Sequence, residues 1–292
     1  MINIIDATKN IPSLFDSGCF NRYKWRIYIN SIYPKCAALF EDDLNKNNYN
    51  YAHEILPIIN SVVNHPLLPT LIDSFKRVTN NLNVLIRNEF EYKVNADIVL
   101  YLGLCNGAGW LTRINNKDVI LLGIEKILEL NWTNEDAMSG LIYHELGHLY
   151  HIQNGTFDQV AKDNVQANIW QLFCEGIAML FEQNLVHNIN YFHQDHNDWL
   201  DWCNHHHHQI LNDFYNDLPI MNYHNQRYFG DWVNYYAHSD VGYYLGAKFV
   251  LYLHENFYFS ELINLSIDKV CESFYQYQKE CNIAMEEALC KK

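Results

Sequence analysis

Residues 133–155 read TNEDAMSGLIYHELGHLYHIQNG, and this segment decides how the rest of the chain is interpreted. Apolar residues recur along it every three or four positions, which is the period of an amphipathic helix. Thr133 is a suitable N-cap, and Asp136, three residues later, can accept the reciprocal hydrogen bond of a capping box. Asn154-Gly155 is a typical helix end. The segment therefore predicts one helix that begins near residue 134 and ends at Asn154.

The predicted helix carries the motif HELGH at His144–His148. Residues four apart lie one above the other on a helix, so the imidazoles of His144 and His148 can both bind one metal ion. Glu145 can take a proton from a water molecule at that metal without binding the ion itself. The composition of the chain predicts about 0.04 chance matches to this pattern, which makes two ordinary histidines on a helix face the weaker interpretation. The motif therefore predicts a catalytic metal site with Glu145 as the general base.

A catalytic zinc ion takes three protein ligands, so the third must come from another segment. Glu175 lies in the sequence FCEGIAM (residues 173–179), where it is the one carboxylate of an otherwise apolar stretch. A carboxylate on a buried face needs a partner, and a metal cation is favoured over the alternative, a buried Arg or Lys. His151 is an alternative ligand, but it lies one turn too far along the helix and points away from the histidine pair.

The combination of HELGH with the segment Glu175-Gly-Ile-Ala178 resembles the gluzincin clan of zinc metallopeptidases, the thermolysin-like zincins, and among them the zinc aminopeptidases. The resemblance implies one catalytic Zn²⁺ ion bound by His144, His148 and Glu175. It also implies that Glu145 is the catalytic base. In such a fold the edge of the sheet near Asn106–Trp110 is expected to flank the metal and to pair with the substrate backbone.

The same resemblance implies a tyrosine that donates a hydrogen bond to the oxyanion formed during the reaction. In the aminopeptidases this tyrosine belongs to a Tyr-x-x-Gly segment downstream of the Glu ligand. Tyr243-Tyr-Leu-Gly246 has this pattern and begins 68 residues after Glu175. Tyr243 is therefore the expected donor, and the adjacent Tyr244 and the nearby His238 are the alternatives.

The chain also departs from the clan's pattern. The interval between His148 and Glu175 holds 26 residues, which is longer than usual in the clan. The clan's Asp four residues after the Glu ligand, which supports a zinc-binding His, would fall at Met179, so that support must come from elsewhere. The Gly-rich segment Asn106–Gly109 lacks the Glu that grips a free α-amine in the aminopeptidases. The resemblance thus implies zinc hydrolysis without implying aminopeptidase specificity.

The whole chain predicts an α+β fold that is predominantly helical. Residues 1–94 are expected to form an N-terminal helical region, because apolar residues recur at helical spacing from Asn21 to about Asn88. Residues 95–292 are expected to form a zincin-like catalytic domain. Its active-site helices are predicted within residues 134–185, and further helices follow toward the C-terminus.

A small antiparallel sheet is predicted over residues 95–124. Residues 97–105 form a short apolar run of strand length that is rich in β-branched residues. Residues 110–113 and 119–122 are two further strand-like segments, and Asn115-Asn116 between them favours a hairpin turn.

Composition limits the partners and the compartment. The 292 residues carry 20 Lys and Arg against 34 Asp and Glu, a net charge of −14 that disfavours nucleic-acid binding. We expect no membrane association, because no apolar run approaches the ~18–20 residues of a membrane span. Residues 1–15 do not have the pattern of a secretory signal. The eight cysteines are widely spaced, as expected for free thiols in a cytoplasmic protein.

These observations predict a cytoplasmic zinc hydrolase that cleaves peptide bonds in a peptide or protein substrate. Two alternatives stay open: a zincin-like binding or regulatory module without catalysis, and a zinc hydrolase of a non-peptide amide. The run His205–His208 is interpreted as a solvated, His-rich surface, with weak transition-metal binding as its alternative. The substrate's identity and the oligomeric state cannot be read from the sequence.

Overall fold

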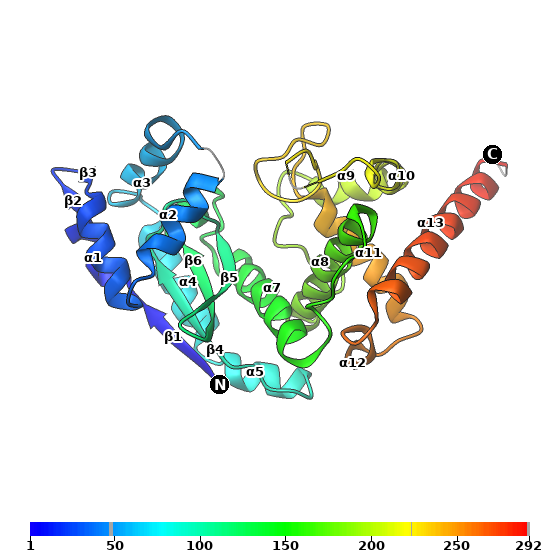
Figure 1. Ribbon diagram of the computed structural model, residues 1–292, viewed down its shortest axis with the longest axis horizontal. Coiled ribbons are helices and arrows are strands. Elements are labelled where there is room, and N and C mark those ends of the chain that lie inside the picture. Colours follow the sequence, from blue (N-terminus) through cyan, green and yellow to red (C-terminus); the bar gives the residue numbers. More distant parts are fainter. Residues whose placement is uncertain (47–48, 223, 291–292) are drawn as a thin grey trace. The chain divides into compact units, whose positions relative to one another are not determined.

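The computed structural model describes residues 1–46, 49–222 and 224–290. They divide into two compact units, Met1–Glu145 and Leu146–Lys292, and the boundary falls inside one continuous helix, α7 (Glu135–Asn154). Helices account for 58% of the structure, and two small sheets supply the strands (Figure 1). The prediction of an α+β, predominantly helical fold is confirmed.

The first unit is built on a four-stranded sheet with the strand order β1-β4-β6-β5. The strands are β1 (Ile2–Asp6), β4 (Ala96–Tyr101), β5 (Gly109–Ile114) and β6 (Lys117–Gly123). β4 runs parallel to both β1 and β6, whereas β5 is antiparallel to β6. The prediction of a wholly antiparallel sheet within residues 95–124 was therefore wrong. All six residues of β4 are buried, and such a continuous apolar run is typical of a strand between parallel neighbours.

The hairpin between β5 and β6 is present as predicted. Asn115 and Asn116 both have positive φ angles, 50° and 64°, as the central residues of a type I′ turn require. Asparagine tolerates this left-handed conformation better than most residues, which is why the pair is a useful signal in the sequence. β5 consequently lies at the edge of the sheet.

Short helices and a second, two-stranded sheet complete the first unit (Figure 1). The second sheet pairs β2 (Phe15–Asp16) with β3 (Cys19–Phe20). The α-helices are α1 (Arg22–Ile32), α2 (Ala37–Lys46), α3 (Leu56–Val62), α4 (Leu68–Thr79), α5 (Leu82–Glu89) and α6 (Ile124–Glu129). A 3₁₀ segment (Thr8–Leu14) follows β1, and a π segment (Tyr51–Ile55) lies between α2 and α3. Residues 1–94 are thus mostly helical, but they also contribute β1, which pairs with β4 inside the same compact unit.

In the described part of the second unit the regular elements are helices, apart from one isolated bridge between Tyr235 and His238. Its helices are α8 (Asn164–Val186), α9 (Trp199–His205), α10 (His207–Asp217), α11 (Val241–His254), α12 (Phe259–Leu262) and α13 (Ile267–Cys290). Asp163 caps α8 by accepting a hydrogen bond of 2.8 Å from the backbone N–H of Gln166. Among the residues that the structure describes, no helix is both long and apolar enough to cross a bilayer.

Helices α8 and α11 approach each other closely at two glycines. A Cβ atom on Gly176 would lie 2.2 Å from the carbonyl oxygen of Gly246, and one on Gly246 would lie 2.6 Å from that of Leu172. Only glycine fits at such a backbone contact, because the obstructing atoms belong to the main chain. The glycine beside Glu175 and the glycine of the Tyr243–Gly246 segment are therefore in contact with each other.

Candidate metal centre

The N-cap of helix α7 lies one residue later than predicted. The side chain of Asn134 accepts a hydrogen bond of 2.8 Å from the backbone N–H of Ala137, whereas Thr133, the predicted N-cap, is buried. Asparagine is at least as good an N-cap as threonine, so the two neighbours compete for the role. The helix then runs without interruption to Asn154, as predicted.

The predicted metal ligands lie close together. One nitrogen of His144, one of His148 and one carboxylate oxygen of Glu175 all lie within 4.8 Å of one another. The Nε2 atom of His148 is 3.1 Å from Oε2 of Glu175. His144 is buried, and the side chains of His148 and Glu175 are 15% and 16% exposed. The three donor atoms are therefore close enough together to hold one metal ion, and two of the three side chains are partly exposed.

The packing of α7 on α8 explains why these groups meet. A Cβ atom on Gly147 would lie 2.7 Å from the Cα atom of Ala178, so the glycine of HELGH allows the two backbones to approach closely. His148 follows Gly147 directly, and Glu175 precedes Ala178 by three residues, which places it almost one turn away on α8. The close contact of the two helices thus brings His148 of α7 next to Glu175 of α8.

The donor set fits a divalent metal ion. Two neutral imidazoles and one carboxylate are ligands of catalytic zinc, which takes three protein ligands and keeps one position open. The same three donors also suit other first-row divalent ions, so the group could hold a metal ion but is not diagnostic of zinc.

Glu145, the candidate general base, lies beside the edge strand of the sheet. Its side chain is 9% exposed, and a Cβ atom on Gly109 of β5 would lie 2.4 Å from its Oε1 atom. A residue larger than glycine at position 109 would displace this carboxylate. The edge strand β5 therefore lies next to Glu145 of the HELGH motif at Gly109.

A buried carboxylate that the sequence analysis missed supports the loop before β5. Glu125 of α6 is 1% exposed and accepts hydrogen bonds of 2.9 Å from the backbone N–H groups of Gly103 and Cys105. Burial raises its pKa, and the two N–H groups act in the opposite direction. The same signal that singled out Glu175, one carboxylate in an apolar run, was present in LLGIEKIL (residues 121–128).

His151, the alternative ligand, is not in the cluster. It is fully buried and its ring lies against the rings of Phe157, Trp170 and Phe173, with centroids 5.3–6.0 Å away. Burial, together with the nearby His148, lowers its pKa to about 3, so it is neutral at physiological pH. His151 is a core residue that packs behind the helix pair.

The three candidate oxyanion donors differ in their surroundings. Tyr243 is half-buried near the start of α11, with its ring edge-on to Phe229 at 5.7 Å. Tyr244 is buried, and its hydroxyl donates to the side-chain oxygen of Asn204 at 3.1 Å. His238 is stacked on Trp202 with centroids 3.8 Å apart. Tyr244 and His238 are thus held by other contacts, and the role of Tyr243 stays a prediction.

The run His205–His208 is only partly the solvated surface that was predicted, because His205 is exposed whereas the other three histidines are half-buried. His206 stacks on Trp202 with centroids 4.2 Å apart, and Nε2 of His207 lies 3.1 Å from the hydroxyl of Tyr277. Burial lowers the pKa of His207 to about 4. The run spans the break between α9 and α10, so its side chains point to different aromatic neighbours. Among the described residues these histidines do not form a group that could hold a metal ion.

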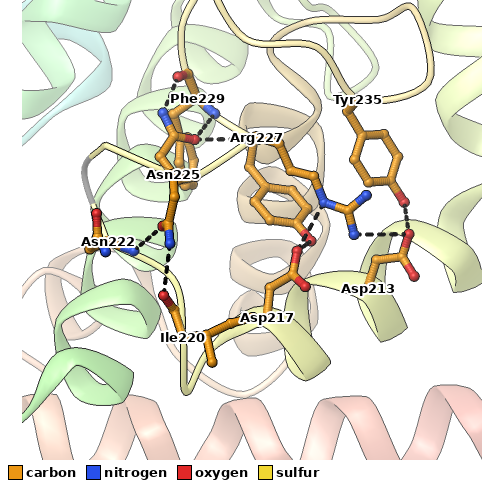
Figure 2. Close-up of polar contacts among 10 residues, drawn as sticks. Asp213, Asp217, Ile220, Asn222, Asn225, Arg227, Phe229 and Tyr235 are labelled. Carbon is orange, nitrogen blue, oxygen red and sulfur yellow. Dashed lines mark hydrogen bonds and ion pairs between the residues drawn. The ribbon is translucent and has the colours of Figure 1, made fainter.

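An ion-pair network fixes the loop that leads to α11 (Figure 2). The guanidinium of Arg227 lies 2.9 Å from Asp217 and 3.5 Å from Asp213, both on α10. The hydroxyls of Tyr228 and Tyr235 donate to the same two carboxylates at 2.7 and 2.8 Å. The sequence analysis missed this network, because its members are scattered along the chain and no short pattern joins them.

A second polar group holds the start of α11. His193 Nδ1 lies 2.9 Å from Oε1 of Glu182, and both residues are buried. Asp240, directly before α11, is also buried, and its carboxylate accepts hydrogen bonds from Gly230 N–H and from the Ser239 hydroxyl. Burial raises its pKa to about 6. Asp240 is the residue before α11, but its side chain makes no capping hydrogen bond to that helix.

No protein-family model, no curated protein and no solved structure matches this chain.

Proposed function

We propose that the protein is a zinc-dependent hydrolase that cleaves peptide bonds. One observation carries the proposal: the donor atoms of His144, His148 and Glu175 lie within 4.8 Å of one another, and a carboxylate occupies the position that follows His144 on the same helix. A site that only stabilises the fold needs closed coordination and has no use for an additional base. The resemblance of HELGH and Glu175-Gly-Ile-Ala178 to the gluzincins supports the same function.

A zinc ion bound by these residues supplies a Lewis acid that polarises a carbonyl group and acidifies a water molecule. The carboxylate of Glu145 accepts the proton of the attacking water and then donates it to the leaving amine. The edge strand β5 lies beside Glu145, where an extended peptide can add to the sheet through backbone hydrogen bonds. The hydroxyl of Tyr243 donates a hydrogen bond to the developing oxyanion.

The test compares the wild type with Glu145→Gln in a peptide-library cleavage assay, together with metal analysis of both purified proteins. Glutamine has the shape of glutamate but cannot accept the proton, so we expect Glu145→Gln to retain about one zinc per chain and to lose cleavage. His144→Ala is the matched control and should lose both metal and cleavage.

The alternatives give different results in the same experiment. A binding or regulatory module retains its ligand binding in Glu145→Gln and cleaves nothing in either form. A hydrolase of a non-peptide amide binds zinc but leaves every peptide of the library intact. Undiminished peptide cleavage by Glu145→Gln overturns the proposed mechanism.

A further inference from the structure

A polar cavity lies in the second unit, along the N-terminal half of α8. Its volume is about 220 Å³, and a water molecule takes up about 30 Å³ in the liquid, so a side chain of the length of glutamine fits. Every described residue that lines it is uncharged. The residues that matter to the argument are Asn164, Asn168, Gln171, Met221, Gln226 and Phe229.

Wall residues of the cavity lie on the same face of α8 as the candidate ligand Glu175. Asn164, Asn168, Gln171 and Glu175 follow one another at spacings of four, three and four, so they lie on one face of α8. Gln171 is thus one turn, about 5.4 Å, before the candidate ligand. An extended peptide rises about 3.3 Å per residue, so a group in the cavity belongs to a residue close to the scissile bond.

A second contact ties the cavity to the candidate oxyanion donor. Phe229 forms part of the wall, and its ring packs edge-on against the ring of Tyr243. Phe229 belongs to the loop that Arg227 fixes to α10 (Figure 2), so this wall is held in place by a network outside the cavity. Tyr243 of α11 is therefore in contact with one wall of the cavity through Phe229.

The hydrogen-bonding capacity of the cavity is unevenly distributed. The carboxamide of Gln226 is engaged at both ends, since it donates to Phe229 O and accepts from the N–H groups of Tyr228 and Phe229. Asn168 donates to the carbonyl of Met221 at 3.0 Å, which leaves its side-chain oxygen as an acceptor. The side chain of Gln171 is exposed and makes no hydrogen bond to any other described residue. Both donors and acceptors are thus available there, without a charge.

We propose that this cavity receives a carboxamide side chain, of glutamine or asparagine, from the substrate residue next to the cleaved bond. The inference rests on the proposed peptidase function and specifies its substrate class. A carboxamide offers one acceptor and two donors, which match Gln171 and the oxygen of Asn168. A carboxylate or an ammonium group enters without an opposite charge and loses hydration, whereas an apolar chain leaves the polar walls unpaired.

The experiment uses matched peptides that carry Gln, Glu, Lys or Met at one position beside the cleaved bond, with one series for each side of that bond. We expect kcat/KM to favour Gln over Glu and Met by about tenfold in one of the two series. Gln171→Leu should remove the preference for Gln over Met, and Gln171→Glu should shift it toward Lys. Gln209→Leu is the matched control, an exposed glutamine on α10, and should leave the preference unchanged.

A binding measurement gives a readout that does not depend on turnover. The same peptides are titrated calorimetrically into Glu145→Gln, alone and combined with Gln171→Leu. The Gln peptide should bind about tenfold more weakly to the double variant, and the Met peptide should not.

The outcomes separate the two proposals. Glu145-dependent cleavage without a preference for Gln overturns the carboxamide pocket and leaves the peptidase intact. Selective binding of the Gln peptide with no cleavage by the wild type supports the pocket and overturns the hydrolase. Absence of both cleavage and selective binding overturns the pocket as well.

Discussion

Glu175 is the residue on which the candidate metal centre depends most. It comes from a different helix than the two histidines, and its carboxylate lies 3.1 Å from His148. With Glu175→Ala, only two ligands on one helix face remain, and two imidazoles bind zinc weakly compared with a three-ligand site. We expect the variant to lose its zinc, as measured by metal analysis after dialysis. If Glu175→Ala keeps one full equivalent of zinc, the third ligand is another residue.

Tyr243 has a distinct kinetic prediction. A hydrogen bond that forms only with the oxyanion lowers the barrier without strengthening substrate binding, so Tyr243→Phe should reduce kcat by about 10²–10³ and change KM little. Zinc content should be unaffected. Tyr244→Phe is the control at the adjacent position, because it removes only a hydroxyl that bonds to Asn204. If steady-state kinetics show full activity in Tyr243→Phe, another group donates the hydrogen bond to the oxyanion.

Between elements, the contact of α8 with α11 is the most constrained. The atoms next to Gly176 are backbone atoms of α11, which cannot rotate away from an added methyl group. Gly176→Ala should therefore lower the free energy of unfolding by about 1–3 kcal/mol, despite the better helix propensity of alanine. Urea unfolding measures this change. A variant as stable as the wild type would show that the helices can separate at no cost.

Elements also differ in how far the sequence predicted them. Helices α7 and α8 and the β5–β6 hairpin follow from short-range patterns: apolar periodicity, and asparagines that tolerate positive φ. The pairing of β1 with β4 joins residues about ninety positions apart, and no local pattern encodes such a partner. The third candidate ligand, Glu175, was found because a carboxylate in an apolar stretch is costly to bury without a partner. Glu125 carried the same signal, but no motif accompanied it.

At the scale of the whole molecule, Asp240 makes stability depend on pH. Its pKa is about 6 in the folded protein, against a usual 3.8, chiefly because it is buried. The neighbouring Asp231 raises the pKa further, whereas Ser239, His193 and the N–H of Gly230 lower it. Since the folded state favours the protonated acid, its contribution to stability is full below pH 3.8 and is lost as the pH rises through 6.

Asp240→Asn tests this dependence, because asparagine keeps the shape and stays neutral. Relative to the wild type, its free energy of unfolding should rise between pH 4 and pH 7, by up to about 3 kcal/mol. Urea titrations of both proteins at each pH give the difference between their free energies of unfolding. Other groups that titrate alike in the two proteins contribute equally to both values and cancel from this difference. A difference that does not change with pH would mean that Asp240 is already charged at pH 4.

The contact between Gly176 and Gly246 also bears on how this protein could change over time. One glycine follows the candidate ligand Glu175, and the other closes the segment that begins at Tyr243. The distance between the carboxylate of Glu175 and the phenol of Tyr243 is therefore set by the main-chain contact of the two helices. Substitutions elsewhere in the core do not easily alter this contact. A substitution at either glycine disturbs both groups at once, and a second substitution at the other glycine adds to the clash, so neither position should tolerate replacement. Substrate preference can meanwhile evolve through exposed positions such as Gln171, which lie outside that contact.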